Sequence, residues 1–248
     1  MGDTPTIGLI VPTAAGEVPA DGPKLYPEGV RFVAAGLGLQ RLTPEGYDSV
    51  IDRVGALAGD LAGQGIQAIA LMGTSLSFYK GHAFNEQLKA TMRAATGLPA
   101  TTMSTGVVEG LRALGVRRVA VGTAYIDEVN NRLRQFLRDS GFDVGAVQGL
   151  GIDMVGQARN VSEQDLVALG ERVLAASPGA DGILISCGGL RTLGVTVPLE
   201  AATGLPVVSS TPAAFWSAVR LVGHGGAAPG YGRLFELGAP TPSATTAS

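Results

Sequence analysis

Residues 68–75 read AIALMGTS and residues 182–189 read GILISCGG, and this pair of segments decides the fold. Each is a short apolar run followed by small residues, which is the pattern of a buried parallel strand and the turn at its carboxyl end. The turns align at a shift of 187 − 73 = 114 residues. The pair therefore favours a chain made of two similar α/β halves.

The same order of features recurs elsewhere along the chain. Three other matches have similar shifts: Ile7–Val11 with Val119–Val121 (119 − 7 = 112), Thr96–Pro99 with Thr203–Pro206 (203 − 96 = 107), and the expected helix caps Thr43 and Ser162 (162 − 43 = 119). Two unrelated α/β stretches would share part of this order of strand, turn and helix, so no single match is decisive. Together the matches predict a first half over 1–114 and a second half over 115–236. The last helix of the second half can pack back on the first half. The small polar residues over 237–248 predict a disordered tail.

Helical patterns separate the apolar runs. One begins with Thr43, Pro44 and Glu45 as cap, first-turn proline and acid, and continues as a single amphipathic stripe through Val50, Ile51, Val54, Leu57 and Leu61. Two more occupy residues 126–137 and, after a Ser162 cap, 166–174. Strands that alternate with helices indicate an α/β fold with parallel sheets.

Composition excludes several classes of function. The chain has 248 residues, 46% hydrophobic and 16% charged, which is enough apolar material for a sizeable core. A net charge of −3 without a basic patch argues against nucleic acid as a partner. One Cys and two His are too few for a disulfide or a typical metal site, and no apolar run is long enough for a membrane span. We expect a cytoplasmic enzyme, sufficient as a monomer, with no metal, cofactor or membrane partner.

The turns after the expected strands are rich in small and hydroxylated residues: Pro12-Thr13, Gly73-Thr74-Ser75, Ser104-Thr105, Gly122–Tyr125, Ser186–Gly189 and Ser209–Thr211. Ligands of parallel α/β sheets bind beyond the carboxyl ends of the strands. Backbone N–H groups and hydroxyls at such turns bind anions without Arg or Lys. These turns therefore predict a site for a small carboxylate.

Cys187 is the only thiol in the chain. A lone Cys is most often a small buried hydrophobe. Its place in a Gly-rich turn directly after a strand favours a reactive residue instead. His82 and His224 have no recognisable catalytic partner and are interpreted as surface or packing residues.

Long segments resemble the arylmalonate decarboxylase family of the aspartate/glutamate racemase superfamily, over roughly residues 5–236. They are Gly8–Pro12, Leu71–Tyr79, Thr102–Thr105, Gly115–Ala120, Thr123–Asp127, Leu184–Leu190 and Pro229–Phe235. The resemblance implies two pseudo-symmetric flavodoxin-like halves, each a parallel four-stranded sheet flanked by helices, with the active site in the cleft between them.

The resemblance also implies a chemistry: cofactor-free, enantioselective decarboxylation of α-aryl or alkenyl malonates through an enediolate. Cys187 would protonate this intermediate on one face, and Gly73 would stand at the matching position of the other half. The retained carboxylate would be held by Thr74, Ser75, Tyr125 and Gly188. The hydrophobic pocket would comprise Pro12, Thr13, Leu39, Leu42, Tyr47, Met72, Leu76, Val155 and Ala158, although several of these are residue types that more often fill a core.

Two positions depart from the family's pattern: Thr13 where a second Pro is expected, and Ala158 where a Met is expected. They leave the chemistry intact and alter the expected substrate range. Two alternatives remain: a racemase or maleate cis–trans isomerase of the same superfamily, and a non-catalytic carboxylate-binding protein. A two-thiol racemase is disfavoured because Gly73 supplies no second thiol.

Overall fold

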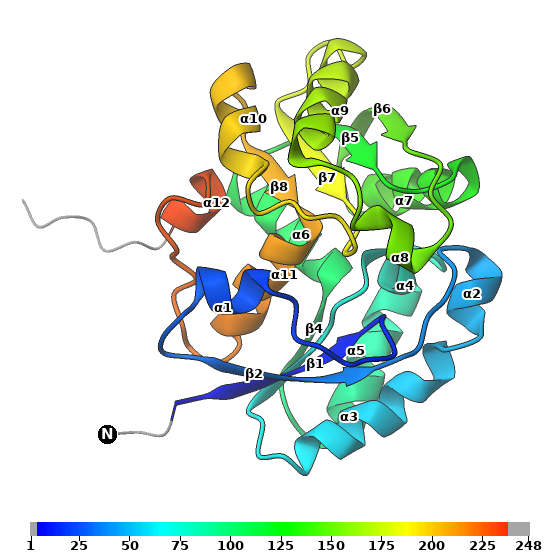
Figure 1. Cartoon of the computed structure of the whole chain (residues 1–248), viewed down its shortest axis with the longest axis vertical. Coiled ribbons are helices and arrows are strands. Elements are labelled where there is room, and N and C mark those ends of the chain that lie inside the picture. Colours follow the sequence, from blue (N-terminus) through cyan, green and yellow to red (C-terminus); the bar gives the residue numbers. More distant parts are fainter. Residues whose placement is uncertain (1–3, 238–248) are drawn as a thin grey trace, which may run out of the picture.

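The apolar runs form two parallel four-stranded sheets in the computed structural model, which describes residues 4–237 (Figure 1). The first sheet has the order β2-β1-β3-β4 and consists of β1 (Thr6–Val11), β2 (Arg31–Gly36), β3 (Ala68–Leu71) and β4 (Ala100–Thr102). The second has the order β6-β5-β7-β8 and consists of β5 (Arg118–Thr123), β6 (Asp143–Gly149), β7 (Gly182–Ser186) and β8 (Val207–Ser209). The order is the same in both, which confirms the expected doubled α/β fold.

No apolar run indicated β2, β4 or β6, and for β2 and β6 the reason is their burial. Both are only partly buried along their length, whereas β1, β3 and β7 are buried throughout. Each lies at one edge of its sheet with a partly solvated face, so its sequence need not be continuously apolar. Corresponding strands nevertheless begin at similar shifts, for example 118 − 6 = 112 for β1 and β5 and 182 − 68 = 114 for β3 and β7.

Helices cover the sheets and connect their strands. In the first half they are α1 (Asp21–Leu25), α2 (Pro44–Asp48), the 3-10 helix η1 (Ile51–Arg53), α3 (Val54–Ala62), α4 (Thr74–Phe78), α5 (His82–Thr96) and α6 (Met103–Ala113). In the second half they are α7 (Asp127–Asp139), α8 (Val155–Ala158), α9 (Glu163–Ala175), α10 (Thr196–Thr203), α11 (Ser210–Arg220) and α12 (Arg233–Glu236). None of the helices within residues 4–237 combines the length and apolar character that crossing a membrane requires.

The single helix expected after Thr43 is broken into α2, η1 and α3, so that prediction was wrong in its extent. The Thr43 hydroxyl accepts from the Gly46 N–H at 3.3 Å, as a cap should. The Ser49 hydroxyl, however, donates to the Gly46 carbonyl at 2.6 Å, and the Val50 N–H turns to the Tyr47 carbonyl. A serine that bonds to a helix carbonyl offers the backbone an alternative to the helical ladder, which explains the break.

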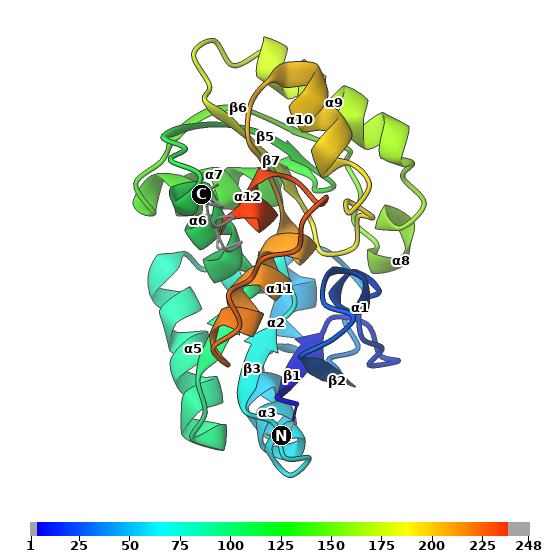
Figure 2. The ribbon, with the colours of Figure 1, turned by 90° about the vertical axis from the view of Figure 1, so that its left-hand side faces the viewer.

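The two halves meet where α6 crosses α11 (Figures 1 and 2). Helix α11 is buried on every side from Ser210 to Val219, as expected of a helix enclosed by protein. It follows β8 in the second half and packs on β3 and β4 of the first. A Cβ added at Gly106 of α6 would lie 2.6 Å from the Ala213 carbonyl oxygen, so the backbones touch directly.

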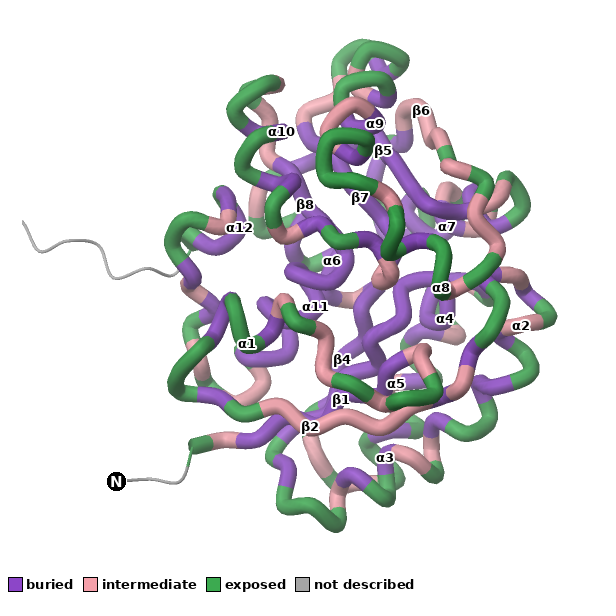
Figure 3. Tube along the Cα trace, in the orientation of Figure 1, coloured by how far each residue is buried: buried purple, intermediate pink, exposed green. Residues whose placement is uncertain are grey.

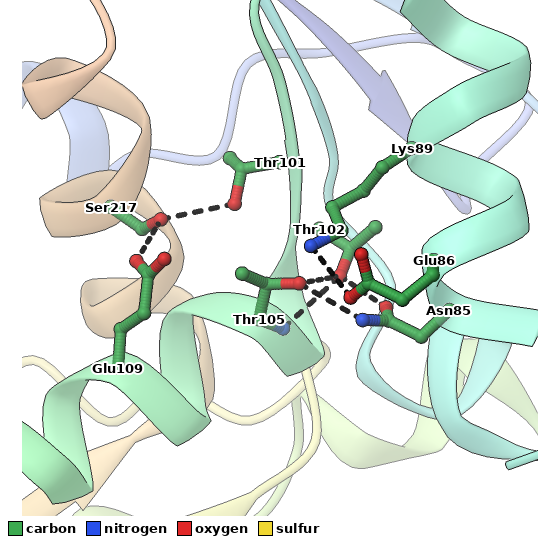
Figure 4. A network of polar contacts seen from close by, with 8 residues as sticks. All are labelled: Asn85, Glu86, Lys89, Thr101, Thr102, Thr105, Glu109 and Ser217. Atoms are coloured by element: carbon green, nitrogen blue, oxygen red, sulfur yellow. Dashed lines mark hydrogen bonds and ion pairs between the residues drawn. The ribbon is translucent and has the colours of Figure 1, made fainter. Parts of the chain in front are cut away.

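Polar contacts join the two helices at this crossing (Figure 4). Ser217 of α11 donates to Glu109 Oε2 of α6 at 2.7 Å, and its hydroxyl lies 3.0 Å from the Thr101 hydroxyl of β4. Since the Ser217 hydrogen is used toward Glu109, Thr101 is the donor to Ser217. One serine thus links both central helices to the first sheet.

Buried residues fill both halves and the region between them (Figure 3). The division after residue 114 is a prediction, and α11, which the proposed boundary assigns to the second half, makes the contacts with the first half given above. Of the predicted tail 237–248, everything beyond Leu237 lies outside the described residues.

We expect Gly106→Ala to destabilise the protein by about 1–3 kcal/mol, because the added methyl collides with backbone that cannot move independently. The measurement is the free energy of unfolding from urea titration. The matched control is Gly59→Ala on the exposed face of α3, where nothing lies within 4 Å of an added Cβ. This control should gain up to about 1 kcal/mol from helix propensity. Equal effects of both changes would contradict the close crossing.

Candidate active site

A cavity of about 400 Å³ opens at the carboxyl ends of β1, β3 and β7. Both halves contribute to it, as expected for ligand sites of parallel sheets. Its lining consists of Val11, Pro12, Thr13, Glu17, Val18, Pro19, Ala20, Leu39, Leu42, Met72, Gly73, Thr74, Ser75, Leu76, Met103, Val155, Arg159, Cys187, Gly188, Gly189 and Arg191.

The turn Gly73-Thr74-Ser75 joins β3 to α4 and presents small polar residues to the cavity. Two of its carbonyl groups contact buried serine hydroxyls. The Ser77 hydroxyl lies 2.9 Å from the Gly73 carbonyl, and the Ser104 hydroxyl donates to the Thr74 carbonyl at 2.9 Å. With the carbonyls engaged on the buried side, the turn is fixed as a donor surface for an anion.

Cys187 follows β7 and is 3% exposed. The Gly189 N–H donates to Sγ at 3.4 Å. Burial raises the pKa of the thiol above its usual value, and this outweighs the opposing effects of the Gly189 N–H, the Tyr125 hydroxyl and the Leu190 N–H. The side chain is therefore held as a neutral thiol that can give a proton.

The turn that follows Cys187 reaches the first half. A Cβ built at Gly188 would lie 3.1 Å from Met103 Sδ and 3.5 Å from the Met72 carbonyl oxygen. A side chain at position 188 would therefore require the Met103 side chain to shift. The absence of a side chain thus brings the turn of β7 against the turn of β3.

Two tyrosines lie behind the cavity rather than on its surface. Tyr47 and Tyr125 are buried, and neither hydroxyl makes a hydrogen bond of good geometry within the described residues. Ser75 and Thr74 are close enough to lower the pKa of Tyr47 and Tyr125 respectively, yet burial raises both pKa values on balance. Both phenols therefore stay protonated and remain free donors beside the turn.

A contact between the halves holds the apolar wall of the cavity. The Leu42 N–H donates to the Asp153 carbonyl at 2.7 Å, and the Val155 N–H donates to the Gln40 carbonyl at 3.2 Å. An ion pair between Arg41 and Asp153 adds to this short antiparallel bridge. Leu42 and Val155, which line the cavity from opposite halves, are thereby kept together.

Most residues singled out in the sequence line this one cavity. Those on it are Pro12, Thr13, Leu39, Leu42, Met72, Gly73, Thr74, Ser75, Leu76, Val155, Cys187 and Gly188. Tyr47, Tyr125 and Ala158 are buried and are not part of the lining. The Ala158 methyl is 3.0 Å from where a Gly189 Cβ would stand, so it packs behind that turn.

Several lining residues were not identified from the sequence. Met103 accepts a hydrogen bond from the Thr74 hydroxyl at 2.8 Å, and its place directly before the expected turn Ser104-Thr105 is a signal that could have identified it. Glu17, Arg159 and Arg191 gave no signal, because isolated charges in loops resemble any solvated surface. Within residues 4–237, no three His, Cys, Asp or Glu side chains cluster in a way that could hold a metal ion.

Fold and site together place the chain among the two-lobed α/β enzymes of the aspartate/glutamate racemase superfamily. The profile of the arylmalonate decarboxylase family matches residues 7–235. An arylmalonate decarboxylase from Bordetella bronchiseptica is 57% identical over 234 residues, which is 94% of this chain and 97% of the relative. The chain belongs to the arylmalonate decarboxylase family and is a carboxy-lyase.

Two other relatives bear on the comparison. The liganded structure of an arylmalonate decarboxylase double mutant, Gly to Cys and Cys to Ser, has a TM-score of 0.92 at 56% identity, covering 94% of this chain and 99% of that one. A maleate isomerase from Nocardia farcinica is 28% identical over 257 residues, covering 98% of both chains.

The raised pKa of Cys187 is open to direct measurement, since no other thiol interferes. We expect thiolate absorbance in the ultraviolet to rise with a midpoint above the value of about 8.5 for a free Cys. The unfolded chain ionises first, so the thiol's contribution to stability is complete below its usual pKa and is lost as pH rises toward the folded value. Cys187→Ser supplies the baseline. A midpoint below the free value would contradict a thiol held neutral.

Proposed function

We propose that this enzyme decarboxylates α-aryl or alkenyl malonates without a cofactor, and that Cys187 delivers the proton to one face of the enediolate. One observation carries the proposal: the single thiol, neutral and buried, shares a cavity with the turn Gly73–Ser75 and an apolar wall. The named substrate of the 57%-identical relative supports the substrate class.

The first step is to bind the carboxylate that the product keeps. The Ser75 hydroxyl and the backbone N–H groups of the two turns are donors on the cavity surface, and the unpartnered Tyr125 hydroxyl lies close by. The Thr74 hydroxyl, which donates to Met103 Sδ at 2.8 Å, would turn from the sulfur to the bound carboxylate. Charge on this carboxylate grows as the second one leaves, because the electrons pass into it as an enediolate. Donors fixed in place stabilise that growing charge more than they stabilise the substrate.

The second step is loss of carbon dioxide. The departing carboxylate faces Leu39, Leu42 and Val155, which offer it no hydrogen bonds. An ionised carboxylate in such surroundings is poorly solvated, whereas neutral carbon dioxide is not penalised there. The bond from the central carbon to this carboxyl breaks, and its electron pair remains on the substrate as the enediolate.

The third step is protonation. The S–H bond of Cys187 breaks and a C–H bond forms at the former central carbon, which leaves a thiolate. Burial disfavours the thiolate, so it recovers a proton from water that enters the open cavity. Each turnover thus consumes one proton and releases one molecule of carbon dioxide.

The single thiol of the chain favours protonation on one face only. Gly73 supplies no acid or base on the opposite face, so neither a two-base racemase nor an isomerase with a second thiol is supported. Tyr47, Pro12, Thr13, Met72, Leu76 and Ala158 complete the proposed substrate-binding region, with Tyr47 and Ala158 acting from behind the lining. The monomeric state and cytoplasmic location remain predictions.

Cys187→Ala should abolish release of carbon dioxide from phenylmalonate, because no other side chain on the cavity lining is a thiol or a phenol, while leaving the fold intact. The measurement is carbon dioxide release beside circular dichroism of both proteins. Near wild-type turnover in the folded variant would refute the proton-donor role. Conversion of maleate without carbon dioxide release by the wild type would favour an isomerase, and no reaction at all would favour a binding protein.

Moving the thiol should invert the product. The double change Gly73→Cys with Cys187→Ser places the donor on the other face without altering Thr74 or Ser75. The backbone at Gly73 is extended (φ −142°, ψ 106°), so Cys causes no strain, but its Cβ would lie 2.6 Å from Leu76 Cδ1. We expect the opposite enantiomer from α-methyl-α-phenylmalonate, at a rate reduced roughly a hundredfold or more. Chiral chromatography decides, and an unchanged enantiomer would disprove the pseudo-symmetric placement.

A further inference from the structure

The rim of the active-site cavity carries charged side chains that the proposed mechanism does not use. Arg159, directly after α8, and Arg191, in the loop between β7 and α10, both line it and are exposed. Neither makes an ion pair or a side-chain hydrogen bond within residues 4–237. Two arginines without a protein partner therefore border a cavity whose interior already provides for both carboxylates of a malonate.

The charges around the rim are not all positive. Glu17 lines the cavity from the loop of the first half that follows β1. Arg191 also borders an adjoining cavity of about 470 Å³ that includes Asp21, Lys24 and Glu163. Arg159 borders only the first of these two cavities, so it is the arginine whose role is more sharply testable.

We propose that Arg159 and Arg191 form a subsite for a third anionic group, carried at the far end of the substrate's aryl or alkenyl substituent. This inference extends the proposed function by naming the class of malonate that the site prefers. The preferred substrates are malonates whose substituent ends in a carboxylate or a group of similar charge.

Geometry supports this division of the cavity. In the proposed function, the turn Gly73–Ser75 and the wall formed by Leu42 and Val155 engage the two carboxyls, and the substituent then extends toward the exposed residues of the lining. A guanidinium pairs with a carboxylate through two parallel hydrogen bonds, which a neutral group of the same shape cannot match. The Glu17 carboxylate, in the first half, repels an anionic substituent. The attraction for that substituent therefore comes from Arg159 and Arg191, in the second half of the chain.

The experiment compares two substrates of nearly equal size, para-carboxyphenylmalonate and para-carbamoylphenylmalonate. Exposed ion pairs contribute little individually, so we expect the wild type to favour the charged compound about three- to tenfold in kcat/KM at low salt. Arg159→Gln with Arg191→Gln should bring this ratio to about one. Glu17→Gln should raise it, and added salt should lower it.

A control variant and a binding measurement make the result decisive. Arg138→Gln removes an equal charge from the exposed end of α7, outside the cavity, and should leave the ratio unchanged. Binding of para-carboxyphenylacetate and its carbamoyl analogue to Cys187→Ser, by calorimetry, tests the subsite without any turnover. If no malonate loses carbon dioxide, the proposed function fails, and the calorimetric binding measurement still tests the subsite. A wild-type ratio of one or less, or a ratio unaffected by the double substitution, would overturn the proposal.

Discussion

The close crossing of α6 and α11 is the constraint on which the rest of the structure depends. Backbone touches backbone at Gly106, and Ser217 ties both helices to β4. Each sheet on its own would present the carboxyl ends of its strands to solvent. Because the two central helices fix the halves against one another, the turns after β3 and β7 face a common cavity.

That cavity joins a polar surface to an apolar one. On one side, the hydroxyls of Ser77 and Ser104 contact the carbonyl groups of Gly73 and Thr74 and so fix the turn whose donors face the cavity. On the other, Leu42 and Val155 form an apolar wall that depends on a backbone bridge between the halves. Electrostatic interactions gain strength in apolar surroundings, so the wall strengthens the contacts that the polar turn makes with an anion.

The buried strands and their turns could be predicted because their signal is local. Ala68–Ser75 and Gly182–Gly189 carry both a continuous apolar run and a small-residue turn, and the structure confirms the doubled fold they indicated. The edge strand β6 and the break at Ser49 were missed for opposite reasons. A half-solvated strand has weak periodicity, and a hydroxyl that competes for a helix carbonyl leaves the apolar stripe unchanged.

The sequence by itself determined the two α/β halves, the single thiol and the small-residue turns, since these follow from residue type and spacing along the chain. Only the tertiary structure decided which residues share a surface. It set Tyr47 and Tyr125 behind the lining, brought Met103 onto it, and placed Arg159 and Arg191 at its mouth. Those positions depend on loops that meet only after both sheets have packed, and contacts between residues so distant in sequence leave no pattern in either segment.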